Sequence, residues 1–247
     1  MRTAAFASRN TKEILRDPLT LFFGVGFPLV LMVLLSAINA GIPQHAAMTM
    51  FHIEKLAPGI SVFGLSFLAL FSSMLIAKDR STSFMLRLFT SPMKPSDFIL
   101  GYVLPILPMA LAQSAICYLF ALFYGMPFGV SLLAAVVINL PIAIFFIALG
   151  LLCGSVLNEK AVGGICGALV TNVSAWFSNI WFDTAMVGGV FQKVADVLPF
   201  SHAVNVARAA AAGDYAAIFP DLWWVIAYAA AMLAAAVAVF SVRLKRN

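Results

Sequence analysis

The feature that most constrains this chain of 247 residues is a set of six long apolar stretches whose interiors hold no Asp, Glu, Lys or Arg. A helix needs about 20 mostly apolar residues to cross a bilayer, and lipid forces such a segment to satisfy its own backbone hydrogen bonds. The sequence therefore predicts an all-α integral membrane protein. Its six transmembrane helices are predicted at Leu19–Asn39, Leu56–Ala77, Phe98–Tyr124, Gly129–Leu157, Ala161–Phe182 and Leu222–Val242.

The composition points the same way and excludes other classes of protein. Hydrophobic residues make up 63% of the chain and charged residues 10%, whereas soluble domains contain about 45–50% and about 25%. The chain has too little polar surface to face water, which argues against a soluble enzyme and against a nucleic-acid-binding domain. The net charge of +5 does not indicate nucleic acid either, because the basic residues flank the apolar stretches. We expect membrane lipid as the surroundings.

The distribution of basic residues predicts the orientation. Twelve of the 15 Lys and Arg residues precede the first predicted span, follow the sixth, or lie between spans two and three or four and five. Loops rich in Lys and Arg stay in the cytoplasm, so both termini are predicted to be cytoplasmic. The basic residues on the other side are Lys55, Lys193 and Arg208.

Residues 1–17 form a separate basic segment ahead of the six-span domain, which covers residues 18–247. Near-helical spacing predicts an amphipathic helix on the inner membrane surface, ended by Pro18. The alternative is a plain basic flank that serves only topology. The basic face holds Arg2, Arg9, Lys12 and Arg16, and a second face holds Ala4, Ala7, Thr11 and Ile14.

The longest polar stretch on the predicted cytoplasmic side is residues 78–97, KDRSTSFMLRLFTSPMKPSD. Residues 81–89 are long enough for about two helical turns. Phe84, Met85 and Leu88 would form an apolar stripe, with Arg80 and Arg87 elsewhere on the surface. Such a stripe in a basic loop needs a cover, either lipid or a partner protein.

The last predicted outer loop, residues 183–221, contains two moderately apolar segments, Val187–Val197 and His202–Ala212. Leu198-Pro199-Phe200 separates them. We expect two short helices that dip into the outer leaflet as re-entrant elements between spans five and six.

The spans themselves contain small and polar residues at informative positions. The pairs Gly150 and Gly154, and Gly163 and Gly167, have the small-xxx-small spacing that permits close helix contact. Sparse uncharged polar side chains either join helices or line a weakly polar cavity for a hydrophobic or amphipathic cargo. The cavity candidates are Phe63, Ser66, Phe67, Asn172 and Asn179.

Catalytic and nucleotide-binding motifs are missing from the sequence. It contains no Gly-x-x-x-x-Gly-Lys-Ser/Thr, no His-Glu-x-x-His and no Gly-x-Ser-x-Gly, which argues against a phosphate-binding loop, a zinc protease site and a hydrolase nucleophile. The chain is predicted to be no enzyme on its own and to hold no metal or cofactor.

Three stretches together resemble the type-2 permease subunits of ATP-binding-cassette (ABC) exporters, over essentially the whole chain. The segment ending Leu15-Arg16-Asp17-Pro18 is similar to that family's interfacial connector helix. The second stretch keeps Asp79, Arg80, Thr82, Leu86, Leu88 and Thr90-Ser91-Pro92, although Ser81 replaces an acid and Ser83 follows the Thr. The third is Leu198-Pro199-Phe200-Ser201-His202, followed by Arg208 and Gly213.

The resemblance implies a transport mechanism. Two six-span subunits, identical or paralogous, would form a dimer, and each would dock a separate cytoplasmic ATPase that holds ATP and Mg. Cargo such as a drug or lipid would enter between spans one, two and five and leave past the outer short helices, as in multidrug efflux. The coupling residues implied are Asp79, Arg80, Phe84, Met85, Arg87 and Leu88, and the connector residues are Arg9, Lys12 and Arg16.

The style of the sequence, rich in alanine with short loops, favours the inner (plasma) membrane of a bacterium. Two alternatives remain open from the sequence. One is a channel or carrier independent of ATP. The other is a membrane-embedded enzyme that acts on lipid, which the lack of ionisable groups in the spans disfavours.

Overall fold

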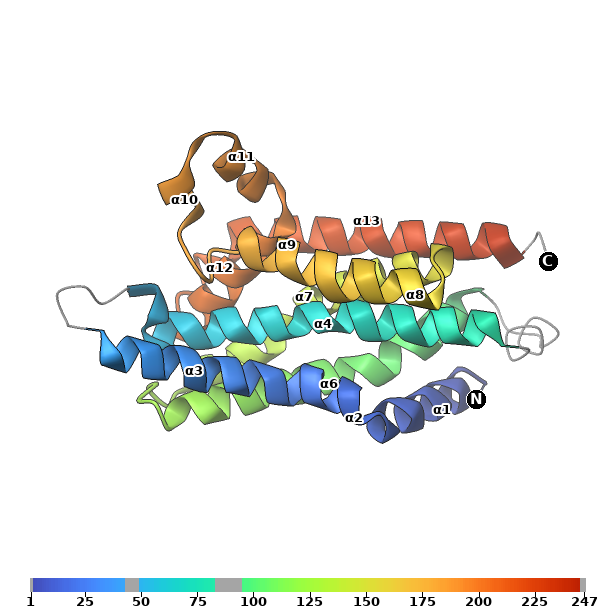
Figure 1. Cartoon of the computed structure of the whole chain (residues 1–247), viewed down its shortest axis with the longest axis horizontal. Coiled ribbons are helices and arrows are strands. Elements are labelled where there is room, and N and C mark those ends of the chain that lie inside the picture. Colours follow the sequence, from blue (N-terminus) through green and yellow to red (C-terminus); the bar gives the residue numbers. More distant parts are fainter. Residues whose placement is uncertain (1, 43–48, 83–94, 245–247) are drawn as a thin grey trace.

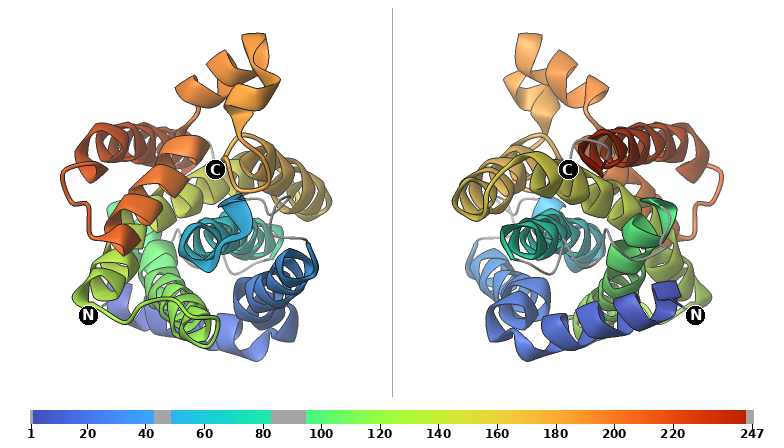
Figure 2. Two further views of the ribbon diagram at one scale, coloured as in Figure 1. Left: turned by 90° about the vertical axis from the view of Figure 1, so that its left-hand side faces the viewer. Right: turned by 90° about the vertical axis from the view of Figure 1, so that its right-hand side faces the viewer.

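The computed structural model describes residues 2–42, 49–82 and 95–244. All regular secondary structure within these three stretches is helical. The long helices run along the longest axis of the molecule, and the end-on views show one central helix surrounded by the others (Figures 1 and 2).

The N-terminal part of the chain turns at Asp17 and Pro18. The carboxylate of Asp17 accepts a hydrogen bond from the backbone N–H of Leu19 at 3.1 Å, and Pro18 occupies the first helical position. An acidic cap followed by proline is a favourable start for a helix. The elements here are α1 (Arg2–Arg16), α2 (Pro18–Leu21), a π-helical stretch (Phe22–Gly26) and α3 (Phe27–Gly41).

The buried face of α1 differs from the sequence prediction. Phe6, Asn10 and Ile14 are buried, whereas Ala4 is exposed. These three buried residues recur every four positions, so they lie on one side of the helix. In the structure, α1 packs through this side against the protein, chiefly against the helix that begins at Pro95.

The central helix is α4 (Ile53–Ser81), which follows a short 3₁₀ turn (Thr49–Phe51). It is the most buried of the long helices, and Figure 2 shows it in the middle of the bundle. Its neighbours include α3, α6 (Pro95–Leu122), α7 (Val130–Val156) and α12 (Pro199–Ala212). The sequence places Lys78, Asp79 and Arg80 in a loop, but they occupy the last turn of this helix.

The closest packing in the bundle joins α4 and α7. A Cβ atom on Gly150 would lie 2.2 Å from the backbone oxygen of Ala69, and one on Gly154 would lie 2.5 Å from that of Ser73. Only glycine permits this approach, so the predicted close contact of this pair is confirmed. The second pair behaves differently, because Gly163 has open space around it.

In the part of the chain that the structure describes, five helices are long and apolar enough to cross a membrane, and each overlaps a predicted span. The remaining predicted span, Ala161–Phe182, is helical but irregular. Its elements are α8 (Glu159–Val162), a π-helical stretch (Gly163–Val170) and α9 (Thr171–Trp176). The prediction that it crosses the membrane remains a prediction.

The described residues after α9 form α10 (Thr184–Val187), α11 (Gly189–Val197), α12 and the long helix α13 (Ile218–Leu244). Figure 1 shows α10 and α11 projecting from the end of the bundle opposite α1. In contrast, α12 is largely buried against α4, α7 and α13. It ends at Gly213, whose φ of 79° lies in the left-handed region that glycine adopts at the end of a helix.

Candidate functional site

The most strongly connected polar site lies where α1 meets the last turn of α4. Asp79 is at its centre, and its side chain is 2% exposed. Its Oδ2 atom accepts a hydrogen bond from Arg9 Nη1 at 2.7 Å and another from the Tyr102 hydroxyl at 2.9 Å. These contacts join α1, α4 and α6. We call Arg9, Glu13, Lys78, Asp79 and Tyr102 the α1–α4 junction.

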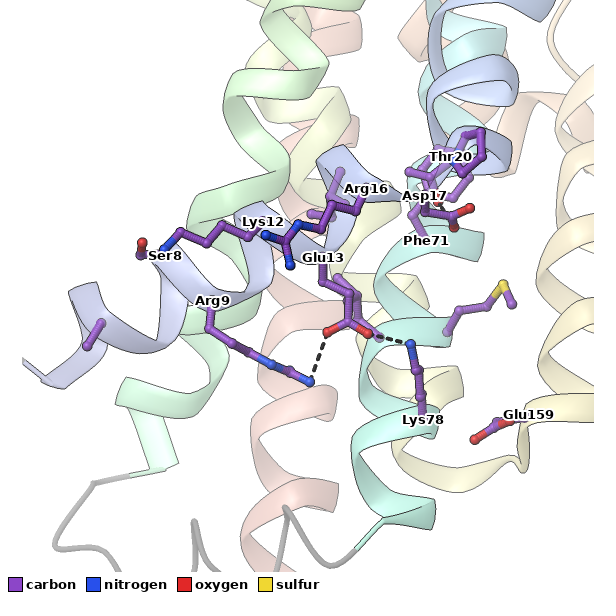
Figure 3. Close-up of a pocket in the computed structure, with 15 residues that line it drawn as sticks. Ser8, Arg9, Lys12, Glu13, Arg16, Asp17, Thr20, Phe71, Lys78 and Glu159 are labelled. Carbon is purple, nitrogen blue, oxygen red and sulfur yellow. Dashed lines mark hydrogen bonds and ion pairs between the residues drawn. The ribbon is translucent and has the colours of Figure 1, made fainter.

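The junction continues as a chain of ion pairs. Glu13 contacts Arg9 Nη2 through Oε2 at 2.8 Å and Lys78 Nζ through Oε1 at 2.6 Å. Figure 3 shows the Glu13 side chain reaching from α1 toward Lys78 on α4. Burial lowers the pKa of Arg9, but the hydrogen bond and charge of Asp79 outweigh it, and the pKa is raised overall. The charges of the junction are therefore mutually compensated.

Further contacts fix α1 to α6. Asn10 Nδ2 donates to the backbone oxygen of Gly101 at 2.9 Å, and Thr3 donates to Asp97 at 3.0 Å. The Phe6 ring covers Gly101 so closely that a Cβ atom there would lie 2.1 Å from Cδ1 of the ring. Thus α1 is docked onto the protein along its length.

Arg80 points to the end of α7. Its Nη1 atom donates to the backbone oxygens of Gly154 and Leu157 at 2.6 and 3.2 Å. The last carbonyls of a helix lack partners within the helix and carry partial negative charge, so a guanidinium there is favourable. Ser81 then donates to Glu159 on α8. The end of α4 is thereby tied to its neighbours.

Only some of the residues predicted to couple to an ATPase or to form the connector lie in the part of the chain that the structure describes. Asp79 and Arg80 contact this chain's own helices, as described, and Arg9 lies within the junction. Lys12 and Arg16 are exposed on α1. The other four, Phe84, Met85, Arg87 and Leu88, lie outside the described residues.

The residues predicted to line a cargo cavity lie in different surroundings. Phe63 and Phe67 are buried and contact each other, with ring centroids 5.7 Å apart, within an aromatic cluster. Ser66 is buried and donates to the backbone of its own helix. The other members of the aromatic cluster are Phe23, Phe27 and Trp181.

The two predicted cavity amides are separate from that cluster. Asn172 is exposed on α9 and donates to the backbone oxygen of Ala168 at 2.8 Å. Asn179 has a φ of 57°, and its backbone oxygen accepts a hydrogen bond from Arg208 at 2.9 Å. The assignment of these five residues to a cargo cavity stays a prediction.

A buried polar cluster joins α4, α6 and α7. Asn139 Nδ2 donates to the hydroxyls of Ser61 and Ser114 at 2.9 and 3.0 Å, and Gln113 Nε2 donates to the backbone oxygen of Ser61 at 3.1 Å. Polar side chains within a bundle in lipid favour partners on other helices. These residues therefore have the structural role that the sequence left as one of two alternatives.

Comparison with known proteins decides the family. The family described as ABC-2 type transporter matches residues 2–211, which is most of the chain. The chain belongs to the ABC-2 type transporter family. No curated protein matches it. Membership of this family makes the chain a multi-pass membrane permease of the ABC class. It also implies that the chain associates with an ATPase subunit.

At the end of this ABC-2 type transporter chain opposite α1, His202 joins α11, α12 and α13. Its Nδ1 atom contacts Asp221 Oδ1 at 2.5 Å, and its Nε2 atom contacts the backbone oxygen of Asp196 at 2.8 Å. The ring stacks on Trp224 with centroids 5.4 Å apart. Because both ring nitrogens face oxygen atoms, the doubly protonated imidazolium is favoured. The hydrogen bond to Asp221 is the main reason that the pKa of His202 is raised.

We expect this contact to make the stability of this end of the bundle depend on pH. A raised pKa means that the folded protein binds the proton more tightly than the unfolded chain does. The stabilisation is therefore complete below the ordinary histidine pKa of about 6.5 and is lost as pH rises through the raised pKa. Thermal unfolding in detergent across pH should show this loss for the unchanged chain and a flatter profile for His202→Gln. Parallel profiles would contradict the assignment.

Proposed function

We propose that the chain is the membrane permease of an ABC exporter that moves a hydrophobic or amphipathic cargo out of the cytoplasm or the inner leaflet. ATP, with Mg, is hydrolysed on a separate subunit, and this chain contributes no catalytic group. The match to the ABC-2 type transporter family over residues 2–211 carries the proposal. The orientation rests on the twelve basic residues of the predicted cytoplasmic side.

The proposal includes a six-span subunit with cytoplasmic termini and a dimer of two such subunits in a bacterial inner membrane. Ala161–Phe182 would be the fifth span, with re-entrant helices after it. Residues 83–94 would contact the ATPase, since they directly follow the last described turn of α4. The hydrogen bonds of Asp79 and Arg80 support this assignment, because they would transmit a displacement of residues 83–94 to α1, α6 and α7.

The proposal predicts that acidic substitutions within residues 83–94 abolish transport while the protein still folds. Phe84→Asp and Leu88→Asp should each abolish capture of the ATPase and reduce export to background, because a carboxylate would face an apolar groove of the partner. The measurement is copurification of the ATPase with the tagged permease, followed by cargo-stimulated ATP hydrolysis in lipid vesicles.

The matched control is Phe128→Asp, because Phe128 is 87% exposed in the turn between α6 and α7. It should retain ATPase capture. Normal capture and export by both coupling variants would refute the docking role. Uphill transport by the chain without an ATPase would instead support a carrier that is driven by an ion gradient and is independent of ATP, and downhill flux without an ATPase would support a channel.

A further inference from the structure

A cavity of about 820 Å³ lies between α1, α2, α4 and α8. It lies where α1 leads into the first membrane span, which begins at Pro18. Because a membrane span begins here, we take this as the level at which lipid headgroups meet hydrocarbon. Figure 3 shows α1 and α4 on its two sides, with the ion pairs of Glu13 between them.

In the described part of the chain, the acidic side chains around this cavity have hydrogen-bond or ion-pair partners, whereas two of the basic ones do not. Glu13 is paired with Arg9 and Lys78. Asp17 caps α2 and also accepts a hydrogen bond from Thr20, while Glu159 accepts one from Ser81. Among the described residues, in contrast, no ion pair involves Lys12 or Arg16, and both are exposed.

Lys12 and Arg16 are well placed to share one ligand. They are four residues apart on α1, and side chains at this spacing are neighbours on a helix surface. Two adjacent cations without partners attract a phosphate, to which lysine offers a point charge and arginine a planar pair of donors.

The opposite wall of the cavity has an apolar part. Phe71, Met74 and Leu75 of α4 form this part, and Met74 is 47% exposed. Lys78, one turn further along α4, also lines the cavity and is paired with Glu13. Next to Lys12 and Arg16, Leu15 is 62% exposed on the surface of α1. A ligand that satisfies both walls has a negative headgroup and a hydrocarbon chain.

From these observations we propose that the cavity binds an anionic glycerophospholipid, with its phosphate at Lys12 and Arg16 and an acyl chain against Phe71, Met74 and Leu75. Lipid is the source that the location favours, because the cavity lies at headgroup depth beside exposed apolar side chains. The site requires only that the chain lies in a membrane, so it is independent of the proposed direction of transport.

The test measures lipid binding to the full chain, purified in a neutral detergent, by native mass spectrometry. Phosphatidylglycerol should bind more tightly than phosphatidylcholine with the same acyl chains. Lys12→Gln and Arg16→Gln should each weaken phosphatidylglycerol binding about fivefold, the effect of one basic residue at an anionic membrane surface. Binding of phosphatidylcholine should change little.

Lys160→Gln is the matched control, because Lys160 is an exposed base on the neighbouring α8 but does not line the cavity. Its binding of phosphatidylglycerol should equal that of the unchanged chain. Equal binding of the two lipids, or equal losses in all three variants, would overturn the proposal. Displacement of phosphatidylglycerol by inorganic phosphate at millimolar concentration would assign the site to a free phosphate and would also overturn it.

Discussion

Gly150→Ala is expected to destabilise the folded protein by about 2 kcal/mol or more, because the added methyl group cannot fit between α7 and α4. It would lie 2.0 Å from Ser72 Oγ and 2.2 Å from the backbone oxygen of Ala69. The helices would have to separate, which also stretches the hydrogen bond from Ser72 to the backbone of Ile147. Unfolding of the purified protein in detergent, followed by circular dichroism, measures the loss.

Gly164→Ala provides the comparison for this prediction. Gly164 is also a helical glycine near the same end of the bundle, but nothing lies within 4 Å of its Cβ position. The same chemical change should therefore be neutral or stabilising by up to about 1 kcal/mol, since alanine favours a helix over glycine. Equal stability of the two variants would show that the α4–α7 contact tolerates a methyl group.

The second large effect is expected at the α1–α4 junction. Arg9→Met leaves Asp79 buried with the Tyr102 hydroxyl as a remaining donor, and removal of one partner from a buried ion pair costs about 3 kcal/mol. The Arg9 side chain is 37% exposed, so part of the interaction is screened by solvent and the lower end of that range applies. Thermal and denaturant unfolding should both report the loss.

A double-mutant cycle isolates the pair from other effects. Asp79→Asn removes the charge that Arg9 neutralises, so Arg9→Met combined with Asp79→Asn should cost less than the sum of the two single changes. Lys160→Met serves as the control, because it removes a cation exposed on α8. A cost for Arg9→Met no larger than that for Lys160→Met would mean that the ion pair contributes nothing.

The membrane helices could be predicted from the sequence because hydropathy is a local property. Five predicted spans match long apolar helices. The segment Ala161–Phe182 is not one of the five such helices among the described residues, because its regular helix ends at Trp176 and carries the polar residues Glu159, Lys160 and Asn172. Its π-helical stretch, like the one at Phe22–Gly26 in the first span, depends on packing against neighbours and leaves no simple signal in one sequence.

The junction could not be predicted, because its partners are distant in the sequence. Arg9 and Asp79 are separated by 70 positions, and the charge pattern alone suggested that Asp79 lies in a loop. The true buried face of α1 was visible in the spacing of Phe6, Asn10 and Ile14. Asn10 obscured this face, because a polar side chain normally indicates a position exposed to solvent. Its burial is explained only by its hydrogen bond to the backbone oxygen of Gly101, which the sequence does not reveal.

The docking of α1 has a mechanical consequence. Attachments at Thr3, Arg9, Asn10 and Glu13 are spread over three helical turns and reach both α4 and α6. A helix attached at several points along its length can neither rotate about its own axis nor slide without breaking these bonds. Any force applied to α1 is therefore transmitted to α4, the most buried helix of the bundle. We expect α1 to move together with α4 and α6 as one rigid unit, and not to move independently on the lipid surface.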